Sequence, residues 1–409
     1  MSNIPKLRFP EFTDAWEKCK LGEVAKRVKG NDGDMSLPTL TISAGSGWLD
    51  QKDRFSGNIA GSEQKNYTLL KRGQLSYNHG NSKLAKYGAV FVLRTYEKAL
   101  VPRVYHSFTM LNNADADFIE FLFATKIPDK ELVKKITSGA RTDGLLNISF
   151  EGFMDIAITL PTLPEQQKIG ALFRRLDRLI TLHKRKWDDV ILLKKALLQK
   201  MFPKNGSDFP EIRFPEFTDA WEKCKLGKIA IKVTEKNKDG IFQETLTNSA
   251  EFGVISQRDF FDKDISNPEN LNGYYIVKPN DFVYNPRISN LAPVGPIKRN
   301  QLNRIGIMSP LYFIFRVSSN IDLDFLDSFF STNLWHLFMK LNGDSGARAD
   351  RIAIKDKIFM EMPISFPTLS EQQKIGNLFK QLDRLITLHK RQHEHYQLLK
   401  KALLQQMFV

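Results

Sequence analysis

The stretch PTLPEQQKIGALFRRLDRLITLHKRK, which begins at Pro161, returns almost unchanged as PTLSEQQKIGNLFKQLDRLITLHKRQ from Pro367, 206 residues later. In both copies, apolar or seam-compatible residues alternate at spacings of four and three, which is the 3.5-residue repeat of a coiled coil. The seam residues are Ile169, Phe173, Leu176, Ile180, His183 and Leu197 in the first copy, and Ile375, Phe379, Leu382, Ile386, His389 and Leu403 in the second. The sequence therefore predicts two long helices that pair with each other. The alternative is that each helix packs on its own globular domain.

A second repeat marks where each half of the chain starts. Arg8–Gly22 reads RFPEFTDAWEKCKLG, and the same letters return as Arg213–Gly227. These repeats divide the chain into a leading segment (1–23), a first insert (24–160), a first helix (161–203), a second leading segment (204–228), a second insert (229–366) and a second helix (367–409).

The two inserts differ in most positions but share landmarks. Leu40–Ala44 matches Leu246–Ala250, and Tyr77-Asn78 matches Tyr284-Asn285. β-favouring runs such as 89–94 and 311–317 are separated by Gly, Asn and Pro turns, and helices are expected near 117–124 and 324–341. Each insert is therefore predicted to be one mixed α+β fold, used twice with different surfaces.

The overall charge indicates a polyanionic partner. The 409 residues carry a formal net charge of +14, and most of the excess lies on the repeated helices. Nucleic acid is the simplest polyanion for a basic chain of this kind. The two cysteines, Cys19 and Cys224, stand at matched positions and are not expected to form a disulfide. With no signal stretch and no apolar run of membrane-spanning length, we expect a cytoplasmic protein without a membrane partner.

Motifs for catalysis are missing from the sequence. It contains no Gly-rich phosphate loop, no HExxH and no Pro-Pro of an amino-methyltransferase signature, for which Asn285-Pro286-Arg287 is the nearest approach. The polar seam residues His183 and His389 lack a Cys, Asp or Glu cluster and are expected to fix register rather than bind metal. We therefore expect no catalytic residues, no cofactor and no metal, so any chemistry must come from another protein.

The duplicated PTL-x-EQQKIG…LDRLITLHKR…LLKKALLQ-x-MF helix and the duplicated RFPEFTDAWE-x-x-KLG segment closely resemble the specificity subunit of a type I restriction–modification system. The resemblance covers nearly the whole chain. It implies two target recognition domains (the two inserts) in a pseudo-two-fold arrangement, joined by two helices that form an antiparallel coiled coil and act as a ruler. It also implies a non-catalytic subunit that binds double-stranded DNA, two methyltransferase subunits and restriction subunits with endonuclease and translocase activity. Each domain would read one half of a bipartite, asymmetric site.

Residues that could read DNA lie in polar, Gly-bearing stretches of both inserts. Arg suits the guanine edge and Asn the adenine edge, whereas Lys and Ser mainly hold phosphates. The candidates in the first insert are Lys52, Arg54, Tyr77, Asn78, His79, Asn81, Ser82, Lys83 and Arg141. Those in the second are Arg258, Tyr284, Asn285, Arg287, Ser289, Asn290 and Arg348. For Asn78 and Asn285 the alternative is a surface turn in which each Asn caps its own backbone.

Two other functions compete with DNA recognition. A scaffold whose two variable domains bind proteins, with the helices as a spacer, is compatible with the divergent inserts and with the neutral charge of 229–366. A stand-alone DNA-modifying enzyme is the weaker alternative, because neither a cofactor motif nor a nucleophile constellation is present.

Overall fold

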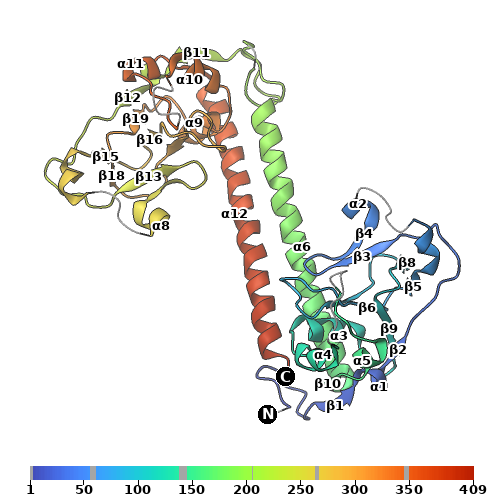
Figure 1. Cartoon of the computed structure of the whole chain (residues 1–409). Helices are drawn as coiled ribbons and strands as arrows, with labels where there is room; N and C mark the ends of the chain where they lie inside the picture. Colours follow the sequence, from blue (N-terminus) through green and yellow to red (C-terminus); the bar gives the residue numbers. More distant parts are fainter. Residues whose placement is uncertain (1–2, 56–60, 138–144, 205, 263–266, 345–349) are drawn as a thin grey trace. The chain divides into compact units, whose positions relative to one another are not determined.

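Two compact units make up the chain. The computed structural model describes residues 3–55, 61–137, 145–204, 206–262, 267–344 and 350–409. One unit contains Met1–Lys184 with Lys390–Val409, and the other contains Arg185–His389. The long helices α6 (Leu163–Lys200) and α12 (Leu369–Gln406) each have 38 residues and contribute to both units (Figure 1). At 1.5 Å per residue, each helix is roughly 57 Å long.

The first unit combines antiparallel sheets with short helices. Its strands are β1 (Glu17–Lys20), β2 (Ala25–Arg27), β3 (Leu40–Ser43), β4 (Gly47–Asp50), β5 (Thr68–Lys71), β6 (Leu75–Asn78), β7 (Ala89–Val92), β8 (Lys98–Val101), β9 (His106–Met110) and β10 (Ala157–Leu160). Its shorter helices are α1 (Leu21–Val24), α2 (Gln51–Phe55), η1 (Gly61–Asn66), α3 (Ala116–Ala124), α4 (Asp129–Lys135) and α5 (Phe150–Met154). A four-stranded sheet has the order β2-β9-β6-β7, beside the pairs β1-β10, β3-β4 and β5-β8.

The second unit repeats this topology strand for strand. Its strands are β11 (Glu222–Lys225), β12 (Ala230–Lys232), β13 (Leu246–Ser249), β14 (Gly253–Ser256), β15 (Tyr275–Val277), β16 (Phe282–Tyr284), β17 (Ile297–Arg299), β18 (Gly306–Met308), β19 (Phe313–Val317) and β20 (Pro363–Phe366). Its shorter helices are α7 (Leu226–Ile229), α8 (Gln257–Phe261), η2 (Pro268–Gly273), α9 (Leu323–Phe330), α10 (His336–Asn342) and α11 (Asp356–Phe359). The sheets are β12-β19-β16-β17, β11-β20, β13-β14 and β15-β18. The predicted α+β fold, used twice, is confirmed.

One predicted helix is two helices in the structure. The sequence suggested a continuous helix over 324–341, but α9 ends at Phe330 and α10 begins at His336. The Ser331 hydroxyl donates to the Asp327 carbonyl at 3.0 Å, and the Thr332 hydroxyl donates to the Phe329 carbonyl at 2.7 Å. Short hydroxyl side chains bonded in this way compete with the helical backbone, which explains the break.

The repeated motifs fasten each leading segment to its long helix. The Arg8 guanidinium donates two hydrogen bonds of 2.7 Å to Glu165, and Arg213 donates two of 2.8 Å to Glu371. Both carboxylates are fully buried, with 0% of their side chains exposed. Hydrogen bonding to Glu165 and Glu371 raises the pKa of the Arg8 and Arg213 guanidinium groups.

The rest of the EQQKIG motif fits each long helix to its globular domain. The Gln166 side chain accepts from the Asp115 amide at 2.9 Å and donates to the Pro161 carbonyl at 2.8 Å. Gln372 makes the same two bonds, to Asp322 and Pro367. A Cβ on Gly170 would lie 2.8 Å from an Asp115 carboxylate oxygen, so this close approach to the α3 N-cap requires glycine.

The end of each repeat completes the core of the other unit. Phe408, which follows α12, packs in the first unit against Trp16, Phe118 and Phe173, with ring centroids 6.1, 5.2 and 5.8 Å away. Phe202, which follows α6, packs in the second unit against Trp221, Phe325 and Phe379 at 5.8, 5.6 and 6.1 Å. Each core therefore contains side chains from both sequence repeats.

The helices run antiparallel within each unit. In the first unit, Phe173 contacts Phe408, Lys400 bonds Asp177 at 2.6 Å, and the His183 ring stacks on Tyr396 at 5.5 Å. In the second unit, Phe202 contacts Phe379 and Lys194 bonds Asp383 at 2.5 Å. The antiparallel pairing that the resemblance implied is confirmed.

The seam residues divide between two kinds of contact. Seam residues near the start of each helix are buried in the globular cores, as the alternative of packing on a globular domain expects. They are Ile169, Phe173, Leu176, Ile375, Phe379 and Leu382. Leu403 and Leu197, near the ends of the helices, pack against these same cores. Ile180, Ile386 and His389 are only partly buried. No helix in the described part of the chain is both long and apolar enough to cross a membrane.

Glu165→Gln is expected to destabilise the first unit selectively. It leaves the mostly buried Arg8 charge without its anion, and breaking a buried pair in this way costs about 3–5 kcal/mol. Hydrogen exchange should show faster opening of the first unit and little change in the second. As a control, Glu97→Gln removes an exposed ion pair with Arg72, for which we expect a change below about 1 kcal/mol. Equal effects of the two variants would contradict this account of the motif.

Phe408→Ala should also destabilise the first unit, although the residue lies at the opposite end of the chain. Removal of a buried phenylalanine costs about 3–5 kcal/mol. The matched variant Phe202→Ala should instead act on the second unit. Denaturant titration with unit-resolved hydrogen exchange measures both. The assignment of Phe408 to the first core and of Phe202 to the second would be wrong if Phe408→Ala weakened only the second unit and Phe202→Ala only the first.

Candidate nucleic-acid interface

Two loops with the same hydrogen-bonded frame lie at matched places in the two units. The first loop, Tyr77–Gly88, joins β6 to β7, and the second loop, Tyr284–Gly295, joins β16 to β17. Tyr77 and Tyr284 are buried, and their hydroxyls donate to the carbonyls of Tyr87 at 2.7 Å and Val294 at 3.1 Å. Burial raises the pKa of both phenols. These tyrosines fix the loops from within and are not available to DNA.

The asparagine after each tyrosine also holds the frame. The Asn78 side chain donates to the Ile42 carbonyl at 3.2 Å and accepts from the Gly80 amide at 3.0 Å. Asn285 donates to the Asn248 carbonyl at 2.8 Å and accepts from the Arg287 amide at 3.0 Å. Both bond the backbone two residues ahead, which is the turn-capping alternative.

Each loop closes through a glycine that no other residue can replace without strain. Gly88 and Gly295 have φ values of +84° and +80°. An added Cβ at either position would collide with the carbonyl oxygen of Asn78 or Asn285. Loop length and closure are therefore identical in the two units, while several of the residues between these ends differ.

Several polar positions differ between the two loops. Gly80 of the first loop corresponds to Arg287 of the second, and Lys83 corresponds to Asn290. The exposed sequence candidates in these loops are Asn81, Ser82, Lys83, Arg287, Ser289 and Asn290. The Arg287 side chain is 63% exposed, and its nearest acidic atom is an Asp350 oxygen 3.8 Å away. It can therefore reach a partner.

His79, which the sequence suggested as a DNA-contacting residue, is buried inside the first unit. Only 3% of it is exposed, and its Nδ1 and Nε2 each lie 2.7 Å from a carbonyl oxygen, of Leu146 and Val104 respectively. Its ring also stacks on His106, with centroids 4.9 Å apart. A side chain with both nitrogens engaged inside the unit cannot reach a base, so we leave His79 out of the proposed interface.

The remaining cationic candidates of the described residues lie on two matched short helices. Lys52, Arg54 and Arg258 are exposed on the matched helices α2 and α8. Arg54 donates to the Ile42 carbonyl at 3.4 Å, the same oxygen that Asn78 contacts. Arg141 and Arg348 lie outside the described residues.

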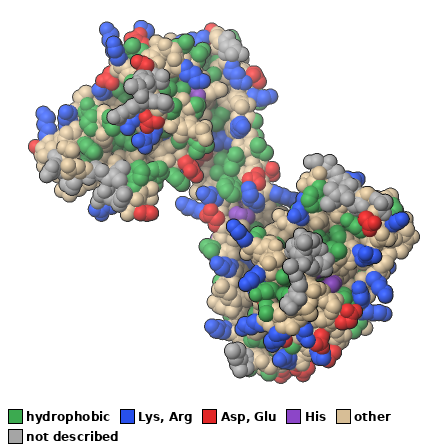
Figure 2. Space-filling view, in the orientation of Figure 1, with side chains coloured by type: hydrophobic (Ala, Val, Ile, Leu, Met, Phe, Trp, Pro, Cys, Tyr) green, Lys and Arg blue, Asp and Glu red, His purple; other side chains and the backbone are tan. Residues whose placement is uncertain are grey.

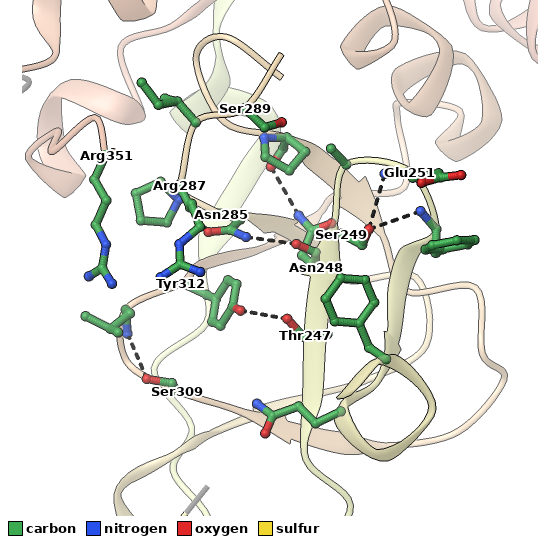
Figure 3. Close-up of a pocket in the computed structure, with 18 of the residues that line it drawn as sticks. Thr247, Asn248, Ser249, Glu251, Asn285, Arg287, Ser289, Ser309, Tyr312 and Arg351 are labelled. Atoms are coloured by element: carbon green, nitrogen blue, oxygen red, sulfur yellow. Dashed lines mark hydrogen bonds between the residues drawn. The ribbon is translucent and has the colours of Figure 1, made fainter. Parts of the chain in front are cut away.

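A pocket opens beside the second loop. Its volume is about 510 Å³, and Thr247, Asn248, Ser249, Asn285, Arg287 and Arg351 are among its lining residues (Figure 3). The Thr247 hydroxyl lies 2.9 Å from the Tyr312 hydroxyl, which repeats the 3.0 Å pair of Thr41 and Tyr105 in the first unit. Polar groups and an exposed guanidinium thus face one opening.

Sequence reasoning missed Thr247, Ser249, Tyr312 and Arg351. Thr247 and Ser249 lie in the stretch 246–250, which matches 40–44. Within this stretch Ile42 is replaced by Asn248, and this change to a polar residue was a signal that the stretch could contact a partner. Arg351 had no such signal, because only the fold brings it to this opening, where it forms an isolated β-bridge with Arg287.

Comparison with known proteins connects this geometry to a family. The model of the type I restriction modification DNA specificity domain matches twice, at residues 13–191 and 218–395. The chain belongs to this family. The MjaVIII specificity subunit of a type I restriction enzyme from Methanocaldococcus jannaschii is 25% identical over 300 residues, covering 69% of this chain and 68% of that protein.

Two solved structures of specificity subunits are similar over almost their full lengths. The S subunit of a type I restriction–modification system from M. genitalium has a TM-score of 0.59 at 11% identity, with 99% of each chain covered. The HsdS subunit from Thermoanaerobacter tengcongensis has a TM-score of 0.44 at 16% identity, with 98% of each chain covered. The M. genitalium structure supports the fold of this specificity-family chain.

Charges of both signs mix on the face of each unit that Figure 2 shows. In the view of Figure 2, Lys and Arg side chains of the described residues are interspersed with Asp and Glu on each unit. Attraction to a polyanion would therefore come from the net charge of +14 as a whole, and specificity from local groups such as those at the loops.

Proposed function

We propose that this chain is the DNA specificity subunit of a type I restriction–modification complex and that each unit reads one half of a bipartite site. The observation that carries the proposal is the pair of loops with one hydrogen-bonded frame and different exposed residues. Two half-sites of different sequence require different contacts held at the same geometry. Membership of the specificity family supports the same function.

The second loop is proposed to read its half-site mainly through Arg287. A guanidinium can donate two hydrogen bonds to O6 and N7 of guanine in the major groove. The Asn290 amide would suit an adenine edge. In the first loop, Asn81 occupies the place of Ile288, and Lys83 and Ser82 would contact phosphates. These differences make the predicted site asymmetric.

The chain is proposed to act without catalysis of its own. Double-stranded DNA, two methyltransferase subunits, and restriction subunits with endonuclease and translocase activity are its expected partners. Among the described residues, no group of three or more His, Cys, Asp or Glu side chains is arranged to hold a metal. In this account the paired helices set the distance between the half-sites and offer a surface to the methyltransferase subunits.

Binding selection from a random duplex pool tests the proposed function. The full-length chain, alone and with its methyltransferase subunits, should enrich two short motifs separated by a fixed unspecified spacer. Its affinity should fall steeply with salt, because phosphate contacts release counterions. A chain that enriches no motif and whose DNA binding is insensitive to salt would fit the protein scaffold instead.

Arg287→Ala should relax discrimination in only the half-site that the second unit reads. Loss of one bidentate pair costs about 1–3 kcal/mol of preference for the correct base. Lys340→Ala is the control, because it removes an exposed cation of the same unit on α10. Comparing enriched motifs of the two variants measures the effect. An Arg287→Ala chain with wild-type preference at every position would exclude Arg287 from base reading.

Lengthening both helices should move the half-sites apart. One added heptad in each helix keeps the seam and adds about 10.5 Å, at 1.5 Å per residue. Insertion of seven residues between Asp188 and Leu192 in α6, and between Leu385 and His389 in α12, should lengthen the preferred spacer by about three base pairs of 3.4 Å each. Duplexes with graded spacers measure the change. An unaltered optimum would show that the helices do not set the spacing.

A further inference from the structure

Three exposed apolar side chains recur at matched positions of the two units. They are Phe55, Leu84 and Val104 in the first unit, and Phe261, Leu291 and Leu311 in the second; we call each set a collar. The two leucines are 71% and 73% exposed, and the other four side chains are 37–61% exposed. A leucine so exposed adds little to the core of its own unit, so packing does not explain its presence in both copies.

Two exposed positions that line the pocket of the second collar have not kept their character. Ser46 corresponds to Phe252, and Arg54 corresponds to Phe260. The surface around the collar therefore changed while the collar stayed apolar. The retained groups suit a contact that both half-sites share, and the changed groups suit contacts that differ between them.

The two leucines are held in position by rigid turns. In the first loop, the Ala85 amide lies 3.2 Å from the Ser82 carbonyl and 3.1 Å from its hydroxyl. The Ala292 amide makes the same contacts with Ser289, at 3.1 and 3.2 Å. Both alanines are buried, so each leucine projects from a turn whose backbone is anchored.

The second collar shares a pocket with polar residues of the second loop. Phe261, Leu291 and Leu311 line the same pocket as Asn285 and Arg287, the opening drawn in Figure 3. In the first unit the Arg54 guanidinium lies 5.1 Å from the centre of the Phe55 ring. Apolar groups mixed with cations match a nucleotide backbone, in which apolar sugar faces alternate with phosphates.

We propose that each collar makes a sequence-independent apolar contact with the deoxyribose faces of duplex DNA, the same in both half-sites, while the polar loop residues inside it read the bases. This proposal rests on the DNA specificity function proposed above. The collar would exclude water from the polar contacts and so strengthen them.

The test uses the full-length chain with Leu84→Gln and Leu291→Gln, each measured on two duplexes. One duplex carries the motif selected by the wild-type chain, and the other has the same composition in scrambled order. Each variant should weaken binding to both duplexes by about tenfold, which corresponds to about 1.4 kcal/mol. The salt dependence and the base preference should not change, because an apolar contact releases no counterions.

Matched variants separate the collar from general damage. Leu291→Met keeps the apolar contact and should bind within about twofold of wild type. Ile231→Gln removes a 68% exposed side chain of β12 that has no apolar counterpart in the first unit, and it should bind as wild type does. Thermal melts that match wild type establish that the glutamine variants are folded.

Three results would overturn the collar proposal. They are unchanged affinity of both glutamine variants, an altered base preference in either, and wild-type DNA binding combined with loss of the methyltransferase subunits. The last would assign the collar to a protein partner. Failure of the proposed function is distinct from these, because it would appear in the wild-type chain as equal affinity for the selected and scrambled duplexes.

Discussion

The buried carboxylates of Glu165 and Glu371 impose the constraint on which the rest of the structure depends. A carboxylate removed from water is tolerated only with a matching charge, and Arg8 and Arg213 supply it through paired hydrogen bonds. Each leading segment must therefore stay on its long helix. The neighbouring glutamine and glycine of the same motif fix that helix against the domain that carries the loops. The repetition of RFPEF and EQQKIG follows from this one joint, because Arg8 and Glu11 contact Glu165 and Lys168, and Gln166 and Gly170 contact Asp115 of the domain.

The same joint explains why the halves of the chain depend on each other. Phe202 belongs to the first repeat but packs in the core of the second unit, beside Trp221. Phe408 belongs to the second repeat but packs in the core of the first unit, beside Trp16. The Leu7 amide then bonds the Gln406 carbonyl, and the Ile212 amide bonds the Lys200 carbonyl, both at 2.9 Å. Neither repeat contains a full core of its own. Two variable domains can thus diverge on their surfaces while the frame that joins them remains fixed by shared packing.

Repetition made most of this fold predictable from the sequence, because identical letters at matched positions must adopt one structure. The two long helices and the duplicated α+β domain follow from it. The burial of Tyr77 and His79 did not, since a polar loop sequence does not reveal which side chains turn inward. The break between α9 and α10 depended on local hydroxyl bonds that apolar periodicity cannot detect. Arg351 reaches the pocket only through tertiary folding, and a single sequence holds no signal for that.

The most direct test of the central claim is a map of adenine methylation in DNA from cells that express this chain with its own methyltransferase subunit. The account predicts methylation confined to one bipartite, asymmetric motif with a fixed spacer. Exchange of 229–366 for another insert of the family should change one half of that motif and leave the other intact. A stable complex that methylates without a bipartite preference, or a motif in which both halves change together, would contradict the account.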